Sequence, residues 1–370
     1  MKIGIDAHAA ESDGSGNCTY IRNLLKSLSE IDNQNEYVLY VTDLHHPFYQ
    51  DFFSCENFKI KQLALKNPLI RIPLLLAWET LKDSLDILHV QYIAPLFHKG
   101  ILVATIHDLG FLHFPDSFSK SEVLRSKTLV RLTAKRSGKI ITGSHFSKND
   151  IAESYKINPL KVEVIPLGVS TTFKPESDPA KAQKILDKYR VQKPYFLCVG
   201  RLNPRKNLIS LVKAFAMIKK EKSIPHKLVI VGKEDFATRK IIQSIKAADS
   251  SSDVLLTGYV EDRDLSSLYN GADVFVYPSL FEGVGLPVLE AMSCGVPVIA
   301  SDSSSLTEIV GDAGLLVNPL DPKEIGDAIF KIISNQDLKK KYAARGISRA
   351  REYSWLSTAQ QTLNIYERLY

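Results

Sequence analysis

Short apolar runs alternate with amphipathic stretches along the whole chain, and this alternation predicts strands that are followed by helices. In the first half, strands are predicted at 2–6, 37–41, 58–63, 87–90, 102–106, 140–142 and 162–165. The second half repeats the pattern, with strands predicted at 195–199, 227–231, 254–256, 272–276 and 298–300. The helices that bear on function are predicted at 17–29, 121–137, 208–220, 288–294 and 355–369. Strands that alternate with helices form parallel sheets covered by helices, so we predict an α/β fold.

A stretch rich in turn residues, 166–175, separates the two series of strands. A chain of 370 residues is long enough for two domains. We therefore predict two Rossmann-like domains with parallel sheets, the first over 1–170 and the second over 176–352.

The composition is that of a soluble globular protein, with 45% hydrophobic and 24% charged residues. A net charge of +6 suits an anionic ligand or an anionic membrane surface. The four cysteines are scattered without a CxxC pair, so neither a zinc site nor a disulfide framework is indicated. The first ten residues begin a predicted strand and do not resemble a signal peptide, and no apolar run approaches the length of a membrane span. We therefore expect a cytoplasmic protein.

The stretch 277–297 holds the strongest candidate site. Its predicted strand ends at Pro278, and a loop with Gly283 and Gly285 leads into the predicted helix 288–294. The glycines allow a ligand to approach the backbone closely, and the helix N-terminus offers free N–H groups to a phosphate or sugar oxygen. Two carboxylates, Glu282 and Glu290, flank this small site. Paired carboxylates alone would also permit a glycosidase.

Two further loops follow predicted strands. Gly14-Ser15-Gly16 lacks the third glycine of a dinucleotide fingerprint, because position 19 is threonine, so it is either an ordinary turn or a loop that packs against a phosphate. The loop after the strand 195–199 holds three cations, which form either a diphosphate clamp or a solvated basic turn: Arg201, Arg205 and Lys206.

His107 ends the predicted strand 102–106, where a histidine is either a satisfied core residue or part of a site. The segment 120–139 carries seven basic residues against Glu122, and Lys127, Arg131 and Lys135 form one stripe of the predicted helix. This stripe is either a solvated face or a peripheral contact with anionic lipid. It has no interleaved aromatic residues, so nucleic acid is not an expected partner.

These motifs together resemble the retaining glycosyltransferases of family 4, which have the GT-B fold of two facing Rossmann-like domains. The central motif is Glu282, seven residues and Glu290, within FEGVGLPVLEAMSCGVPVIAS. Further matches are VGRLNPRKNL (199–208), TGYVEDRDLSSLYNGADVFVYPS (257–279), GDAGLLVNP (311–319), IHDLGFLHFP (106–115) and YSWLSTAQQTLNIYERL (353–369). The resemblance covers nearly the whole chain and is strongest over 195–319. It departs at DGSGNCTY, where many members have Gly-Gly-Ile-Gly, so only Gly16 is carried over there.

The resemblance implies an acceptor-binding domain over 1–170, to which the final helix 355–370 crosses back, and a donor-binding domain over 176–352. Arg201 and Lys206 would hold the diphosphate of a nucleotide sugar, with Arg205 as a further cation, and Glu290 would bind the ribose. The donor sugar would be held by Glu282, Gly283, Val284, Gly285 and Leu286. Gly16 would approach the diphosphate from the other domain, and His107 would lie beside the sugar near the reacting carbon.

Cleavage of a sugar–diphosphate bond develops negative charge on the leaving phosphate, which fixed cations and a helix N-terminus stabilise. With Arg201 and Lys206 in this role, no metal and no cofactor are expected. Retention in the family resembles front-face attack, in which the leaving phosphate helps to deprotonate the acceptor. We therefore assign no side chain as a general base.

We predict a retaining hexosyltransferase that acts on a glycan acceptor, lipid-linked at the cytoplasmic face of the membrane, in cell-surface polysaccharide synthesis. Two other classes stay open, because a fold does not fix a function. One is an isomerase or phosphorylase on the same fold, although no cofactor lysine of a phosphorylase is identified. The other is a protein that binds nucleotide sugars without catalysis.

The predicted donor is GDP-mannose, with a UDP-sugar as the alternative. The loop after the strand 254–256 lies beside the nucleobase in the family, and it contains Val260, Glu261 and Asp262. A carboxylate there can accept two hydrogen bonds from the guanine edge, whereas uracil offers one such donor. Asp262 is the first choice for this contact and Glu261 the second. Both acids could equally be solvated loop residues.

Overall fold

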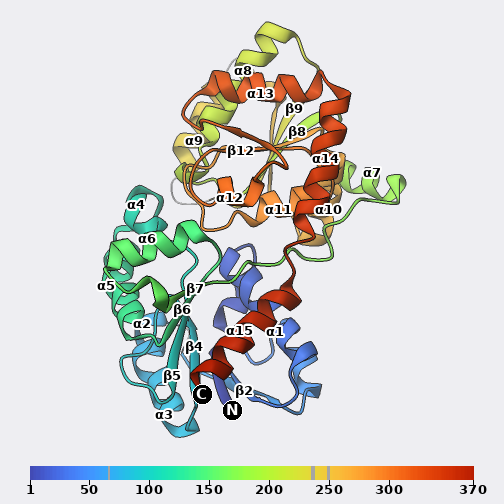
Figure 1. Cartoon of the computed structure of the whole chain (residues 1–370). Helices are drawn as coiled ribbons and strands as arrows, with labels where there is room; N and C mark the ends of the chain where they lie inside the picture. Colours follow the sequence, from blue (N-terminus) through green and yellow to red (C-terminus); the bar gives the residue numbers. More distant parts are fainter. Residues whose placement is uncertain (66, 235–237, 248–250) are drawn as a thin grey trace. The chain divides into compact units, whose positions relative to one another are not determined.

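The computed structural model describes residues 1–65, 67–234, 238–247 and 251–370, and the chain forms two compact units (Figure 1). Unit 1 comprises Met1–His113, Lys120–Gly168 and Ser354–Tyr370. Unit 2 comprises Phe114–Ser119 and Val169–Tyr353. Each unit is built on its own parallel sheet and is described by itself.

A seven-stranded parallel sheet forms the centre of unit 1, in the order β3-β2-β1-β4-β5-β6-β7. Its strands are β1 (Lys2–Asp6), β2 (Glu36–Val41), β3 (Phe58–Gln62), β4 (Ile87–Gln91), β5 (Ile101–Thr105), β6 (Lys139–Thr142) and β7 (Val162–Val164). The strand order reverses between β1 and β4, which pair directly. At such a switch point the connections leave toward opposite faces of the sheet, and ligands of open α/β sheets bind beside the carboxyl ends of the strands.

Helices cover both faces of this sheet. The α-helices are α1 (Gly16–Ile31), α2 (Pro68–Ile70), α3 (Ala77–Asp83), α4 (Gly110–His113), α5 (Lys120–Arg136), α6 (His145–Tyr155) and α15 (Trp355–Leu369). Shorter elements are the 3-10 helices η1 (His8–Glu11), η2 (Pro47–Ser54) and η5 (Pro159–Lys161), and the π-helix η3 (Arg71–Leu76). On one face, Leu76 packs with strand residues such as Leu88 and Leu102 in a buried apolar cluster.

The last helix, α15, belongs to unit 1 although it follows unit 2 in the sequence. The Trp355 ring lies 6.3 Å from the ring of Tyr20 on α1, and the Tyr366 hydroxyl lies 2.5 Å from Nδ1 of His89 on β4. A Cβ at Gly168 would lie 2.2 Å from the backbone nitrogen of Trp355, so glycine allows this close approach. The prediction that the final helix returns to the N-terminal domain is confirmed.

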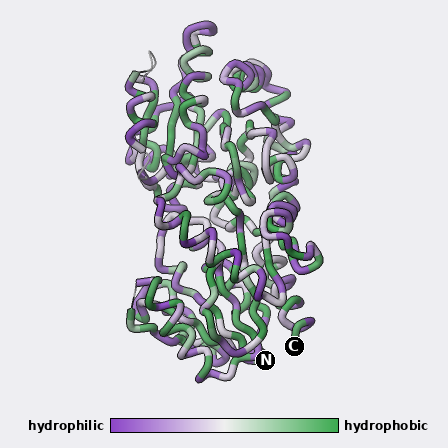
Figure 2. Tube along the Cα trace, turned by 90° about the vertical axis from the view of Figure 1, so that its left-hand side faces the viewer, coloured by the Kyte–Doolittle hydropathy of each residue, from purple (hydrophilic) through white to green (hydrophobic). Residues whose placement is uncertain are grey.

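Unit 2 repeats the same topology with a six-stranded parallel sheet in the order β10-β9-β8-β11-β12-β13. Its strands are β8 (Tyr195–Val199), β9 (Lys227–Val231), β10 (Val254–Gly258), β11 (Val274–Tyr277), β12 (Val298–Ser301) and β13 (Leu315–Val317). The order reverses between β8 and β11, where Phe275 is in register with Leu197. The inner strands of both sheets are mostly hydrophobic, as expected for strands buried on both faces, whereas the edge strand β3 carries Lys59 and Lys61. Figure 2 shows hydrophobic segments in the interior of each unit.

The α-helices of unit 2 are α7 (Pro179–Lys188), α8 (Leu208–Lys222), α9 (Thr238–Ala247), α10 (Asp262–Gly271), α11 (Leu286–Ser293), α12 (Leu306–Val310), α13 (Pro322–Ile333) and α14 (Gln336–Ala350). The short 3-10 helices are η4 (Pro115–Ser117), η6 (Pro204–Lys206) and η7 (Ser251–Asp253). Two Rossmann-like parallel sheets therefore confirm the predicted fold class. No helix within the described ranges has both the length and the apolar character needed to cross a bilayer.

Three differences from the sequence prediction bear on the site and on the two units. Helix α11 begins at Leu286, before the predicted start at 288, because Gly285 has a φ of +86° and serves as its N-cap. Strand β13 was not predicted, because its three residues, LLV, lack the alternation of the equally short β7, VEV. Residues 114–119 group with unit 2, where Ser117 O accepts a 3.0 Å hydrogen bond from Asn203.

Candidate functional site

A polar cluster in unit 2 lies beyond the carboxyl ends of β8 and β11, the two strands at the switch point of the sheet. The loop after β8 contributes Arg205 and Lys206, and the loop after β11 contributes Ser279 and Glu282, while Tyr277 ends β11 itself. Because β8 and β11 are paired in parallel, both loops leave the same edge of the sheet. The topology therefore joins residues that are more than seventy positions apart in the sequence.

Backbone hydrogen bonds hold these two loops together. The carbonyl oxygen of Arg205 accepts from Leu280 N at 2.8 Å and from Ser279 Oγ at 3.1 Å. In return, the Arg205 guanidinium donates to the carbonyl oxygen of Phe281 at 3.0 Å. The Asn203 side chain accepts from Arg205 N at 3.0 Å and so fixes the start of η6. The loops thus form a rigid frame around the charged side chains.

Lys206 and Glu282 form a buried ion pair at the centre of the cluster. Lys206 Nζ lies 2.5 Å from Glu282 Oε1 and donates to the Tyr277 hydroxyl at 2.6 Å. The same carboxylate oxygen accepts from Ser279 at 2.5 Å and from Tyr277 at 3.1 Å. The other oxygen, Oε2, lies 3.9 Å from Arg205 Nη1. One carboxylate oxygen therefore has three short partners, whereas the other has a single longer contact.

The Glu282 carboxylate stays ionised despite its burial. Burial by itself raises the pKa, but the charges of Lys206 and Arg205, with hydrogen bonds from Lys206 and Ser279, bring the pKa of Glu282 down to about 2. The cluster thus keeps a fixed anion between two cations. An anionic ligand at this place would meet an arrangement of charges that is already in position.

The loop of Gly283, Val284 and Gly285 leads from Glu282 into α11. A Cβ at Gly285 would lie 2.6 Å from the side chain of Leu306, and the φ of +86° also favours glycine there. Pro287 occupies the first turn of α11, where its missing N–H costs nothing. The N-terminus of α11 therefore lies beside the ion pair and adds the positive end of its dipole.

Glu290 lies on α11, one turn beyond this N-terminus, and it differs from Glu282 in its environment. Its Oε2 accepts a 2.8 Å hydrogen bond from the hydroxyl of Tyr269 on α10. Burial, opposed by that hydrogen bond and supported by the charge of Asp262, raises the pKa of Glu290 to about 8. Glu290 is thus protonated at neutral pH, and Asp262 at the start of α10 lies close enough to influence it.

The remaining predicted donor residues lie on the loops that follow β8 and β10. Arg201 is exposed on the loop after β8, and Val260 is buried at the start of the loop before α10. Glu261 is exposed, and its carboxylate lies 2.7 Å from Arg263 Nη2. The Tyr259 ring, which the sequence analysis did not single out, is 40% exposed beside these acids, with Lys233 Nζ 4.3 Å from its centre. This aromatic ring is therefore a further candidate ligand contact.

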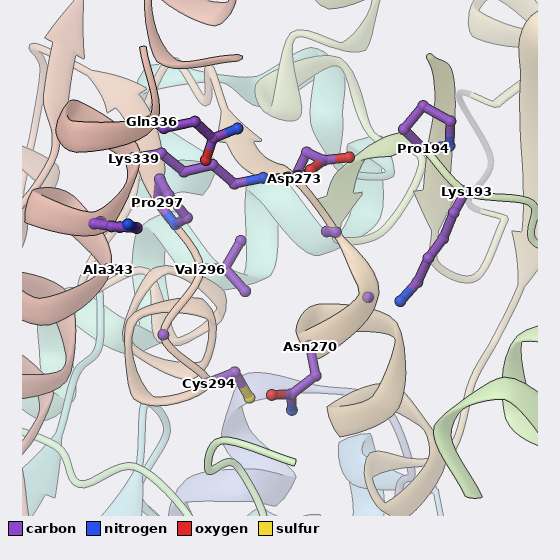
Figure 3. Close-up of a pocket in the computed structure, with 14 residues that line it drawn as sticks. Lys193, Pro194, Asn270, Asp273, Cys294, Val296, Pro297, Gln336, Lys339 and Ala343 are labelled. Carbon is purple, nitrogen blue, oxygen red and sulfur yellow. Dashed lines mark hydrogen bonds and ion pairs between the residues drawn. The ribbon is translucent and has the colours of Figure 1, made fainter. Parts of the chain in front are cut away.

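A pocket of about 620 Å³ in unit 2 lies away from this cluster (Figure 3). Its lining includes Pro194, Asp273 and Pro297, which precede or begin β8, β11 and β12. It therefore opens at the amino ends of the strands, whereas Lys206 and Glu282 follow the carboxyl ends. The Lys339 ammonium from α14 points toward Asp273 in Figure 3 and is ion-paired with it. The pocket is not part of the candidate site.

In unit 1, His107 follows β5 at the carboxyl edge of its sheet. Its Nε2 lies 3.1 Å from the amide oxygen Oε1 of Gln91 at the end of β4, so Nε2 carries the proton and Nδ1 a lone pair. The ring of Tyr20 on α1 packs edge-on at 4.8 Å. Burial, opposed by the charge of Asp108, lowers the pKa of His107 to about 4. His107 is therefore a neutral imidazole with a defined tautomer.

Gly16 is the first residue of α1, and the side chain of Ser15 caps this helix by accepting from Cys18 N at 3.2 Å. A Cβ built at Gly16 would have no heavy atom within 4 Å. Packing inside unit 1 thus does not require glycine at this position.

The sequence analysis missed several residues that hold the predicted ones in place. Tyr277 and Ser279 bind the Glu282 carboxylate, and Tyr269 binds that of Glu290. Gln91 and Tyr20 orient His107. Their positions at strand ends and inside a helix gave a weak signal, because their partners are distant in the sequence. Among the described residues, no three His, Cys, Asp or Glu side chains lie close enough to share a metal ion, and the expectation that none is required stays a prediction.

Comparison with known proteins gives two matching family models. The model described as Glycosyltransferase Family 4 matches residues 17–173, and the model described as Glycosyl transferases group 1 matches residues 182–349. O-antigen chain mannosyltransferase B of Escherichia coli is 33% identical over 268 residues, which are 72% of this chain and 70% of the relative. O-antigen chain mannosyltransferase RfbU of Salmonella typhimurium is 33% identical over 229 residues, 62% of this chain and 60% of the relative.

Among solved structures, a sucrose-phosphate synthase from Thermosynechococcus elongatus matches with a TM-score of 0.76 and 21% identity. The match covers 100% of this chain and 99% of that chain. At this identity the likeness concerns the fold alone, which is that of the GT-B proteins.

The raised pKa of Glu290 predicts that this residue makes the free energy of unfolding depend on pH, and that Glu290→Gln removes this contribution. The folded state holds this proton more tightly than the unfolded state, in which the pKa is near its ordinary value of 4.5. Its contribution to the free energy of unfolding is therefore full below pH 4.5 and falls as the pH rises through about 8. Between pH 6 and pH 8.5, the free energy of unfolding measured with urea should fall more for the wild type than for Glu290→Gln. The control is Glu324→Gln, which changes an exposed glutamate and should behave as the wild type does. An equal fall in the free energy of unfolding of all three proteins would contradict the prediction.

The contact between Gln91 and His107 predicts that Gln91→Glu raises the pKa of the imidazole. A carboxylate beside Nε2 favours the imidazolium, so the pKa should rise by about one to three pH units from about 4. The measurement is the titration of the His107 ring resonances by NMR, with the exposed Gln183→Glu as the control. If His107 titrates as in the wild type, the Gln91 side chain does not contact it.

Proposed function

This chain belongs to the glycosyltransferases, with a family 4 domain over 17–173 and a group 1 domain over 182–349, and we propose that it is a retaining mannosyltransferase that uses GDP-mannose. The acceptor in this proposal is a lipid-linked glycan at the cytoplasmic face of the membrane, in the synthesis of a cell-surface polysaccharide. The O-antigen mannosyltransferases that the chain resembles support mannose as the sugar and a polysaccharide as the product. The observation that carries the proposal is the ion pair of Lys206 and Glu282 beside the N-terminus of α11.

The cations of the cluster would stabilise the leaving group. Lys206, Arg205 and the exposed Arg201 follow the same strand, and the α11 N-terminus adds N–H groups on the other side. When the bond between the sugar and the diphosphate breaks, negative charge grows on the leaving oxygen. Because Glu282 and Tyr277 hold the Lys206 ammonium in place, it needs no reorganisation as this charge develops. The side chains thus supply the charge that a metal ion would otherwise provide.

Glu282 would bind the donor sugar through one oxygen only. Its Oε1 is occupied by Lys206, Ser279 and Tyr277, whereas Oε2 has its contact with Arg205 at 3.9 Å. We assign Oε2 to a hydroxyl of the sugar, together with the backbone from Gly283 to Leu286. Glu282 would then position the donor and hold Lys206 at the same time, and it would not attack the sugar as a glycosidase nucleophile does.

The transfer step would proceed by front-face attack. The bond between C1 of the sugar and the phosphate oxygen breaks, and the nucleoside diphosphate leaves with the electron pair. The oxygen of the acceptor hydroxyl forms the new bond to C1 on the same face, and its proton passes to an oxygen of the leaving phosphate. His107, a neutral imidazole, would accept or donate a hydrogen bond at the sugar without adding charge there. Gly16 would allow the diphosphate close to the α1 backbone, since no packing inside unit 1 explains glycine there.

The guanine preference would arise in the loop before α10. Asp262 lies close enough to raise the pKa of Glu290, the residue assigned to the ribose, so the two acids belong to one neighbourhood. This proximity supports Asp262 as the acceptor of hydrogen bonds from the guanine edge. Glu261, whose carboxylate lies 2.7 Å from Arg263 Nη2, stays the second choice for this role. A UDP-sugar donor is the alternative.

We expect that Glu282→Gln lowers the rate of transfer at least roughly a hundredfold while the protein stays folded, because the variant loses a charged group that positions the donor and Lys206. The release of nucleoside diphosphate from a panel of nucleotide sugars, with and without a glycan acceptor, measures the rate. Release that requires an acceptor also separates a transferase from an isomerase or a binding protein.

A double variant tests whether a loss of activity comes from misfolding, because removing one partner of a buried ion pair destabilises a protein by several kcal/mol. Lys206→Met with Glu282→Gln removes both charges and should be folded but inactive. The matched control is Lys323→Met with Asp327→Asn, which removes an exposed ion pair of α13 and should retain full activity. Near-wild-type turnover in Glu282→Gln or in the double variant at residues 206 and 282 would overturn the site assignment.

The predicted donor specificity gives a separate test by calorimetry. The wild type should bind GDP more tightly than UDP, and Asp262→Ala with Glu261→Ala should remove this preference, because uracil cannot use both hydrogen bonds of a carboxylate. The Lys323→Met and Asp327→Asn protein again serves as a control with unchanged preference. Tighter binding of UDP by the wild type, or a GDP preference that survives both alanine substitutions, would contradict the guanine site and favour the UDP-sugar alternative.

A further inference from the structure

An ordered apolar face lies on the outside of unit 1, on the segment that contains η3 and α3. Leu74, Trp78 and Leu81 follow one another at helical spacing, and their exposed fractions are 62%, 60% and 41%. Just before them, Leu69 and Ile70 are also exposed. The opposite side of the same segment is well packed, because Leu76 belongs to the buried cluster with Leu88 and Leu102. The exposure is therefore a property of one face and does not reflect poor packing of the segment.

Helix α5 presents a second exposed face that combines basic and apolar residues. Lys127, Arg131 and Lys135 are all exposed, as the sequence stripe requires. A parallel stripe of Leu124, Thr128 and Leu132 is exposed beside it, with Leu124 at 72%. The inner side of the helix is formed by the buried residues Val130, Thr133 and Ala134. An exposed surface that alternates leucine with lysine and arginine is typical of a helix that lies at a membrane interface.

The loop after β4 joins these two faces. Ala94 packs in the same buried cluster as Leu76, and its N–H donates to Thr133 Oγ1 on α5 at 2.9 Å. Arg136 at the end of α5 donates to the carbonyl oxygens of Pro95 and Leu96 at 2.9 and 2.7 Å. Leu96 and Phe97 on this loop are exposed, Phe97 by 70%. Helices α2, α3 and α5 accordingly lie on the same side of the seven-stranded sheet (Figure 1).

We propose that this combined surface docks on an anionic lipid bilayer. We call it the Trp78 face, and its residues are Leu69, Ile70, Leu74, Trp78, Leu81, Leu96 and Phe97, with the cations Lys127, Arg131 and Lys135. The apolar side chains enter the boundary between headgroups and acyl chains, and the cations contact lipid phosphates. Lys82 lies with its ammonium 4.9 Å from the Trp78 ring, the arrangement of an aromatic ring and a snorkelling lysine at a membrane interface.

The charge of the face favours lipid over a second copy of the chain. A symmetric dimer through this surface would bury the three cations of each copy in one interface, because a twofold interface uses the same patch twice, and the Trp78 face itself holds no acidic residue to pair with them. Like charges across an interface oppose association. A bilayer with anionic headgroups instead supplies opposite charge to the stripe and an apolar layer to Leu74 and Trp78. The proposal adds to the proposed function, whose lipid-linked acceptor would lie at such a surface, and it is tested without any turnover.

The test uses the full chain with vesicles of phosphatidylcholine containing 30 mol% phosphatidylglycerol, as a ~30% anionic surface of the kind that attracts basic segments. The chain has two tryptophans, and Trp355 is buried, so the shift of tryptophan emission reports Trp78. The wild type should co-sediment with these vesicles at low salt, and its emission should shift to shorter wavelength. Replacement of Lys127, Arg131 and Lys135 by serine should weaken partitioning by roughly a hundredfold. The variant with Leu74→Gln and Trp78→Gln should also partition more weakly, and its loss relative to the wild type should not depend on the salt concentration.

Matched controls lie elsewhere on the surface. Lys181→Ser, Lys184→Ser and Lys331→Ser remove three exposed cations of unit 2, and Leu160→Gln with Leu320→Gln removes two exposed leucines. Both control proteins should partition as the wild type does.

Absence of binding by the wild type, or unchanged binding by the Leu74 and Trp78 variant, would overturn the proposal. A concentration-dependent dimer that Leu74→Gln with Trp78→Gln dissolves would do so as well, because a second copy would then cover the face. Failure of the wild type to release nucleoside diphosphate from any nucleotide sugar would instead challenge the proposed function, and it would leave the vesicle result unaffected.

Discussion

The buried ion pair between Lys206 and Glu282 is the interaction around which the candidate site of unit 2 is organised. Both charges are largely removed from water, and such a pair is tolerated only when further hydrogen bonds satisfy it. Tyr277 and Ser279 provide these bonds, and hydrogen bonds between Arg205 and residues 279–281 join the two loops. The pair is possible because β8 and β11 are parallel neighbours at the switch point, which brings the two loops to one edge.

The two glutamates of the motif illustrate how environment separates identical side chains. Glu282 has cations beside both oxygens, so its pKa falls to about 2. Burial, together with the charge of Asp262 and against the hydrogen bond from Tyr269, raises the pKa of Glu290 to about 8. One residue is a fixed anion and the other is a neutral donor or acceptor at neutral pH. This difference suits a site in which one glutamate holds a lysine and a sugar and the other contacts uncharged hydroxyls.

Unit 1 combines a small polar site with an unusually apolar exterior. His107 is kept neutral and in one tautomer by burial, Gln91 and the ring of Tyr20. The same unit exposes leucine and tryptophan side chains on η3 and α3, and leucine and basic side chains on α5. Exposed apolar groups gathered on adjacent elements mark interaction surfaces more often than single exposed residues do. Both features belong to the unit to which the proposed function assigns the acceptor.

The sequence by itself determined the fold class with its two Rossmann-like parallel sheets, the strands of both sheets apart from β13, and the charged residues that are candidates for the site. These follow from local periodicity, from glycine and proline at strand ends, and from motifs whose spacing is fixed by one loop and one helix. Only the tertiary structure decided that Lys206 binds Glu282, that Tyr269 binds Glu290, and that Gln91 orients His107. It also decided which leucines remain exposed. The reason is physical: such contacts depend on which strands are neighbours and which helix face is covered, and no local pattern in the chain encodes either.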